Sequence, residues 1–194
     1  MKGSTILIVS LFFVSSLAMA ESKYNSGWYA GIGAGTTHNN NHDSLDESST
    51  SITGLGGYRF NKYLAIQGNF VDLGKYDGTG SVLKSLKLKA ITFTAVGILP
   101  IGSNGIELYG RLGLGVLTYT QTFDLFGAEL ENSSSGDSIV SAVGVSYTPV
   151  FFQKMSIYLG YEDYYFETKK VYSSNNDVQS NSVGVIAFGA RYNF

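Results

Sequence analysis

Apolar side chains recur at every second position over most of this chain, which is the pattern of β-strands with one apolar face. The alternation is clearest over 106–119, where bulky aliphatic residues alternate with charged, aromatic or glycine residues. Together with turn signals, this periodicity predicts an antiparallel all-β fold. The predicted strands are 27–36, 51–60, 63–74, 87–99, 106–119, 137–148, 155–166 and 183–194.

The connections between these strands alternate in length. Those after the second, fourth and sixth strands are short, and the others are long and polar, covering 37–50, 75–86, 120–136 and 167–180. Long loops at one end and short turns at the other are typical of outer-membrane barrels. Strands of about eleven residues also match the roughly 9–11 residues that cross a bilayer when tilted. We therefore expect both ends of the mature chain on the periplasmic side.

Composition favours a membrane-spanning barrel over a water-soluble sheet. Charged residues make up 14% of the chain, against about 25% in soluble domains. In hydrocarbon each unpaired backbone group costs several kcal/mol, so the sheet must close on itself. The prediction is an all-β, eight-stranded antiparallel up-and-down transmembrane β-barrel. The chain has no cysteine, which excludes disulfides, thiolate chemistry and a lipidated cysteine.

The N-terminus has the form of a secretion signal. Lys2 precedes a short apolar run, and 18–20 has the small-x-small form of a signal-peptidase site. The run is too short to span a bilayer as a helix. We expect a cleaved signal peptide over 1–20, a single barrel domain over 21–194, and export to the outer membrane.

Strand parity places a set of charged residues opposite the apolar face. Charges facing lipid at mid-depth would cost about 2–4 kcal/mol each, so we expect these side chains in the lumen. Arg111 and Glu162 fall near mid-height, and we hypothesise that they form a salt-bridge network that plugs the barrel; solvation by trapped water is the alternative. The full predicted lumen charge network is Arg59, Glu107, Arg111, Glu162 and Arg191.

These features together resemble the small outer-membrane β-barrel family that includes the OmpA transmembrane domain and the opacity-type surface antigens. The residues that carry the resemblance are the signal through Ala20, the strand segment 54–60, the strand exit 70–76 and the aromatic C-terminus. In that family the C-terminal strand carries an assembly signal, met here by Gly189, Tyr192 and Phe194, although Ala187 replaces its polar position. The resemblance implies recognition by the outer-membrane assembly machinery.

Catalytic and ligand-carrier functions fit the sequence less well. An enzyme needs a nucleophile beside an activating base, and the histidines, His38 and His42, lie in the first predicted loop. Near them lie Asp43, Asp46 and Glu47, but a solvated loop is expected rather than a metal site, and no cofactor is predicted. A soluble lipocalin-like carrier would require the apolar face to point inward.

The expected function is therefore that of an integral outer-membrane protein which displays four polar surface loops. A structural, adhesion or host-interaction role is predicted, with a lumen plugged by side chains; a small low-conductance porin is the alternative, and a lipid A-modifying enzyme is disfavoured. Expected partners are outer-membrane lipid and lipopolysaccharide, with a host or surface ligand at the loops. The net charge of −2 makes nucleic acid an unsuitable partner.

Overall fold

The computed structural model describes residues 26–39, 48–77, 83–125, 128–169 and 178–194. The predicted signal peptide over 1–20 lies outside these residues, as does His42. Within the described ranges, no helix is long and apolar enough to cross a membrane.

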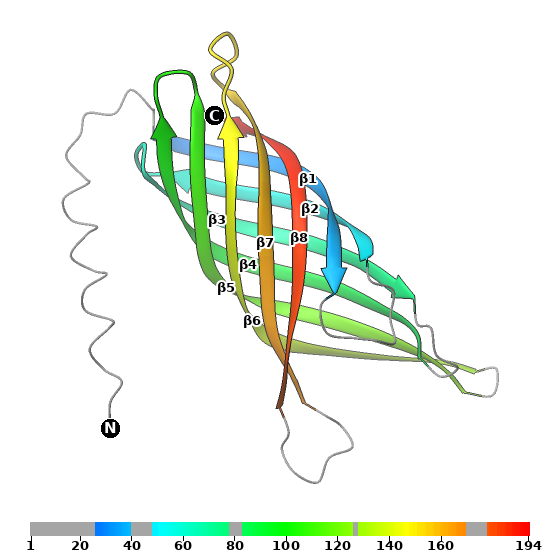
Figure 1. The fold of residues 1–194 in the computed structure, drawn as a ribbon. Coiled ribbons are helices and arrows are strands. Elements are labelled where there is room, and N and C mark those ends of the chain that lie inside the picture. The colour runs from blue at the N-terminus through cyan, green and yellow to red at the C-terminus, as the bar shows by residue number, and fades with distance from the viewer. Residues whose placement is uncertain (1–25, 40–47, 78–82, 126–127, 170–177) are drawn as a thin grey trace, which may run out of the picture.

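The described residues form one closed antiparallel sheet, in which each strand pairs with its neighbours in chain order (Figure 1). The predicted fold class, an eight-stranded antiparallel barrel, is confirmed. The strands are β1 (Gly27–Asn39), β2 (Ser48–Arg59), β3 (Leu64–Asp77), β4 (Leu83–Ile101), β5 (Ile106–Leu125), β6 (Ala128–Tyr147), β7 (Met155–Lys169) and β8 (Val178–Asn193).

The first and last strands close the ring. Their pairing runs from Tyr29 opposite Asn193 to Asn39 opposite Val183. At the end of the seam, the Phe194 N–H donates a hydrogen bond of 2.9 Å to the Trp28 carbonyl. The sheet consequently has no open edge along the seam, which is the condition for strands in hydrocarbon.

The outer face of the barrel is apolar. Ile32 of β1 is 72% exposed and Leu114 of β5 is 69% exposed, whereas the residues at the alternate positions of these strands point inward and are covered. At the end where β2 turns into β3, which we call the turn end, aromatic rings form a girdle. Trp28 and Tyr58 have ring centroids 5.1 Å apart, and the rings of Tyr192 and Phe194 lie 5.4 Å apart.

The third predicted loop, 120–136, was wrong, as was the predicted start of the sixth strand at residue 137. β5 and β6 continue as a paired hairpin as far as Leu125 opposite Ala128. In Figure 1 this hairpin extends past the other strands toward the lower right. Its residues are polar yet strand-forming, since Thr118 and Ser135 hydroxyls hydrogen-bond across the strands at 3.1 Å. Polarity was therefore a poor guide to where the sheet ends.

Inside the barrel, large tyrosine side chains lie over glycines of neighbouring strands. A Cβ added to Gly144 would lie 2.5 Å from the Leu159 carbonyl oxygen and 2.5 Å from the Tyr109 ring. A Cβ on the outward-facing Gly110 would instead meet only the Ala142 oxygen, at 3.9 Å. The inward glycines thus provide the room into which the lumen tyrosines fit.

This packing predicts different effects for two otherwise similar substitutions. Gly144→Val should lower the free energy of unfolding by about 1–3 kcal/mol, because the added side chain would collide with the Tyr109 ring, which packs against this glycine. Gly110→Val, on the lipid side, should leave it nearly unchanged. Urea unfolding in lipid vesicles, followed by fluorescence of the single tryptophan, Trp28, measures both. Equal losses in the two variants would contradict the packing account.

Candidate functional site

The lumen is the candidate site, and its charged layer at the turn end centres on Glu107. This carboxylate, 1% exposed, accepts a hydrogen bond of 2.8 Å from Arg59 and pairs with Arg191 at 3.2 Å. The Ser146 hydroxyl donates to the same carboxylate at 3.3 Å. Four strands, β2, β5, β6 and β8, are therefore joined through one side chain.

Strand ends determine which residues meet in this layer. Arg59 is the last residue of β2, and Glu107 is the second residue of β5, so both lie near the turn end. The Arg59 guanidinium also donates to the carbonyls of Asn61 and Lys62, at 3.0 and 2.9 Å. The charged layer is thereby coupled to the β2–β3 turn.

A second polar layer lies deeper in the barrel, around Arg111 and Glu162. The two side chains are directly paired, and both are buried, with 5% and 4% of the side chain exposed. The Tyr164 hydroxyl donates to the other Glu162 oxygen at 2.7 Å. Arg111 also donates to the Asn69 Oδ1 at 3.4 Å, and the Gln67 amide donates to the same oxygen at 2.6 Å.

All five charged residues predicted for the lumen lie inward, and the structure divides them into these two groups. Glu107 joins Arg59 and Arg191, while Arg111 joins Glu162. Two of the guanidinium groups also lie over a ring: Arg111 is 5.5 Å from the Tyr109 centroid and Arg191 is 5.6 Å from the Tyr29 centroid. Because buried ions are costly unless paired and hydrogen-bonded, these contacts stabilise charges inside the barrel.

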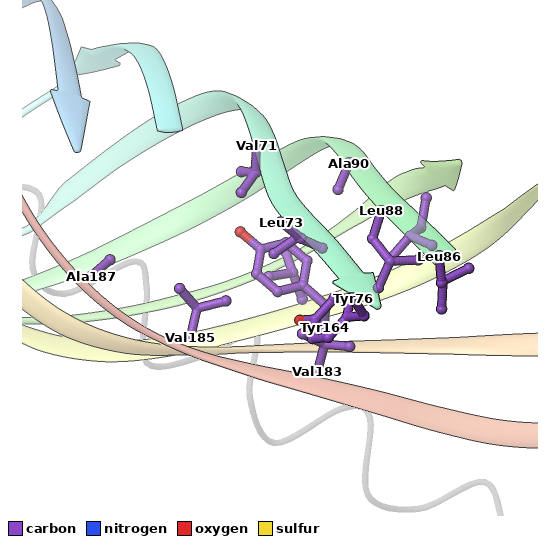
Figure 2. Packing of buried hydrophobic residues seen from close by; sticks show 12 residues of the cluster. Val71, Leu73, Tyr76, Leu86, Leu88, Ala90, Tyr164, Val183, Val185 and Ala187 are labelled. Carbon is purple, nitrogen blue, oxygen red and sulfur yellow. The ribbon is translucent and has the colours of Figure 1, made fainter. Parts of the chain in front are cut away.

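Sequence reasoning missed a third, apolar layer that fills the lumen beyond the Arg111–Glu162 pair. Figure 2 shows side chains of β3, β4, β7 and β8 converging there. Leu73, Tyr76, Leu117 and Tyr164 are completely covered. The layer comprises Val71, Leu73, Tyr76, Leu86, Leu88, Ala90, Leu117, Val140, Tyr164, Val183, Val185 and Ala187.

A β-bulge in β3 contributes to this apolar layer. The register between β3 and β4 shifts between Asp72 and Gly74, and Gly74 has a φ of 88°. A bulge inserts an unpaired residue and reverses which side chains face inward. Leu73 and Tyr76 therefore both point into the lumen, three positions apart. A glycine within an otherwise regular strand was the sequence signal for this bulge.

The remaining candidate residues lie apart from the lumen charges. Gly189 is inward, beneath the Tyr158 ring, whereas Tyr192 and Phe194 face outward, 41% and 73% exposed. His38 is exposed near the end of β1, and Asp43, Asp46 and Glu47 lie outside the described residues. Among the residues that the structure describes, no cluster of three or more His, Cys, Asp or Glu side chains could hold a metal ion.

The class of protein follows from the two faces of the sheet. An apolar outer wall, a closed hydrogen-bonded ring and a packed lumen define a β-barrel that crosses a bilayer. A soluble carrier of the lipocalin type has the opposite arrangement, with its apolar face inward. Leu114 and Phe93 are 69% and 61% exposed on the outer face, which would be polar in a soluble carrier.

Comparisons with known proteins identify the family. Residues 4–194 match the outer membrane protein beta-barrel domain, and the chain belongs to this family. Among curated protein sequences, none matches significantly. The resemblance to small outer-membrane barrels is confirmed, and membership of this family places the protein in the outer membrane.

Solved structures share this fold at low sequence identity. Neisserial surface protein A has a TM-score of 0.58 at 22% identity, with 88% of this chain and 100% of that chain covered. OprG of Pseudomonas aeruginosa has a TM-score of 0.59 at 15% identity, with 88% and 97% covered. Ail, the attachment invasion locus protein of Yersinia pestis, has a TM-score of 0.53 at 22% identity, with 87% and 97% covered.

Removal of the shared carboxylate should destabilise the barrel strongly. Glu107→Ala leaves two buried guanidinium groups without their common partner, so we expect a loss of about 3–5 kcal/mol in unfolding free energy. The control is Asp77→Ala, which removes a carboxylate that is 64% exposed and pairs with Lys75 at 2.9 Å; its loss should be under about 1 kcal/mol. Urea titration in vesicles measures both, and similar values for the two would refute the assignment.

Proposed function

We propose that this protein is a non-enzymatic surface protein whose barrel is a rigid, closed support for extracellular hairpins that contact molecules outside the cell. The observation that carries the proposal is the extended β5–β6 hairpin. β6 pairs with β7 only from Ser138 to Tyr147. The part of β6 from Ala128 to Asp137 is paired with β5 alone among the described residues.

The free edge of β6 is suited to binding an extended segment of another protein. An unpaired strand edge presents backbone N–H and C=O groups that can accept an added strand. Edges in soluble proteins are commonly blocked by proline, lysine or a bulge. The segment 128–137 contains neither proline nor lysine, and the β5–β6 pairing continues along it without a register shift. Glu131 and Asp137 on this segment favour a partner with positive charges.

A packed lumen supports a surface role over transport. Two polar layers and one apolar layer occupy it in succession, and Leu117 and Tyr164 in the last layer are fully covered. An eight-stranded barrel is only wide enough for its interior to be filled by side chains or to hold one small ligand. We infer that the layers together prevent a continuous water path, with the small low-conductance porin as the alternative.

A barrel of similar fold has been crystallised with a bound ligand. Ail has been crystallised in complex with the heparin analogue sucrose octasulfate. At 22% identity this likeness extends to the fold and not to the ligand. For the present chain, lipopolysaccharide around the barrel and a host or surface protein at the hairpins are the proposed partners, with assembly through the C-terminal strand.

Shortening the hairpin should remove surface binding without unfolding the barrel. In the variant, residues 121–132 are replaced by Asn-Gly. The new turn then joins Thr120 to Ser133, which are cross-strand partners. Expressed in a non-adherent Gram-negative strain, the full chain should increase adhesion to cultured epithelial cells, and the variant should not. Heat-modifiable migration on detergent gels verifies that both are folded. Equal adhesion by the two would contradict the proposed role of the hairpin.

Planar-bilayer recordings distinguish the packed lumen from the porin alternative. The purified full chain should give no stable channels, because three successive layers of side chains fill the barrel. A porin of known conductance, inserted into the same bilayers, is the positive control. Stable, reproducible conductance steps from the full chain would refute the closed barrel and favour the low-conductance pore.

A further inference from the structure

Asp163 is an acidic residue on the lipid-facing side of β7. Its neighbours in sequence, Glu162 and Tyr164, are buried in the lumen, so the alternation of the strand places Asp163 on the outer face. On that face it lies between Tyr161 and Tyr165, which are 44% and 48% exposed. A carboxylate among apolar neighbours at membrane depth is rare, and such residues usually mark a functional site.

The neighbouring strand shows that Asp163 lies within the apolar wall. Asp163 is directly opposite Ser141 of β6, while Tyr165 is opposite Ile139 and Tyr161 is opposite Val143. Ile139 and Val143 are exposed to the same side, 52% and 64%. Apolar or aromatic rows therefore flank the polar row on both sides.

A groove of about 600 Å³ runs across the outer wall beside Asp163. Its floor consists of small residues, Ala95, Gly97, Gly110 and Ser141, and larger side chains such as Leu112 form its walls. A floor with little or no side chain makes room for a chain of methylene groups between the walls.

The Asp163 carboxylate has hydrogen-bonding capacity left over. Its Oδ2 accepts a hydrogen bond of 2.8 Å from the Tyr165 hydroxyl. Its Oδ1 is enclosed and has no hydrogen-bond partner in the described structure. A carboxylate oxygen can accept two hydrogen bonds, so Oδ2 has one acceptor site left besides the bond from Tyr165 and can accept a donor that reaches it through the groove.

We propose that this groove binds one lipid molecule whose acyl chain lies along the small-residue floor and whose amide or hydroxyl group, at the base of that chain, donates to Asp163. The surroundings of Asp163 determine this chemistry. The carboxylate lies between the exposed Tyr161–Val143 and Tyr165–Ile139 pairs of the apolar wall, which face the acyl chains of the membrane. Ester-linked acyl chains provide no N–H or O–H donor there, and a charged head-group ammonium is disfavoured beside these apolar pairs.

Two lipids with the same head group test the proposal. Ceramide phosphoethanolamine carries an amide and a hydroxyl at the chain base, and diacyl phosphatidylethanolamine carries esters. Each is added to the purified full chain in detergent, and native mass spectrometry measures the bound fraction. We expect about a tenfold preference for the amide lipid, the effect of one hydrogen bond to a charged group. In Asp163→Leu the preference should fall to about one.

Two further variants distinguish the contribution of the hydrogen bond from that of the groove that holds the acyl chain. Asp77→Leu removes an exposed carboxylate at the end of β3, outside the groove, and should keep the tenfold preference. Gly110→Leu fills the floor, and its Cβ has only an ordinary contact of 3.9 Å, so the barrel should fold while both lipids bind less. The proposal is overturned by equal binding of the two lipids to the unmodified chain. A preference that survives Asp163→Leu would also overturn it.

Discussion

Backbone hydrogen bonding in hydrocarbon is the constraint on which the rest of the structure depends. Every N–H and C=O within the bilayer needs a partner in the sheet, so β8 must return to β1, and the register from Tyr29–Asn193 to Asn39–Val183 completes the ring. Closure with eight strands fixes the width of the barrel. The lumen is then a space of given size that the inward side chains must fill.

The filling of that space explains the glycines and the charges together. Tyr109 and Tyr158 are accommodated because glycines of adjacent strands leave room for their rings. Glu107 and Glu162 are accommodated because guanidinium groups reach them from across the ring. Buried pairs of this kind add little net stability compared with apolar packing, but breaking one is costly. The side chains of the lumen are therefore used for structure, which is why we propose that recognition takes place on the outer wall and at the hairpins.

The sequence was sufficient for the fold and for the inward charges, because both depend on a period of two. It was insufficient for the hairpin: threonine and serine residues within 118–135 form cross-strand pairs, but their polarity led to the prediction of a loop. It also failed for Tyr76, whose direction depends on the Gly74 bulge and not on parity. The outward position of Asp163 could have been predicted from the alternation of β7 alone, because it lies between Tyr161 and Tyr165. It was overlooked because only the apolar and aromatic residues of that face were considered.

Two adjacent residues of β7 face different environments, the lumen and the membrane. Glu162 points into the lumen, where Arg111 and Tyr164 satisfy both of its oxygens. Asp163 points outward, where Tyr165 satisfies one oxygen and the other has no partner in the described structure. A carboxylate inside the barrel depends on partners from the protein itself, as Glu162 shows. On the outer wall a donor from the membrane can reach Oδ2 beside Tyr165, so the remaining acceptor capacity of Asp163 indicates a site for lipid.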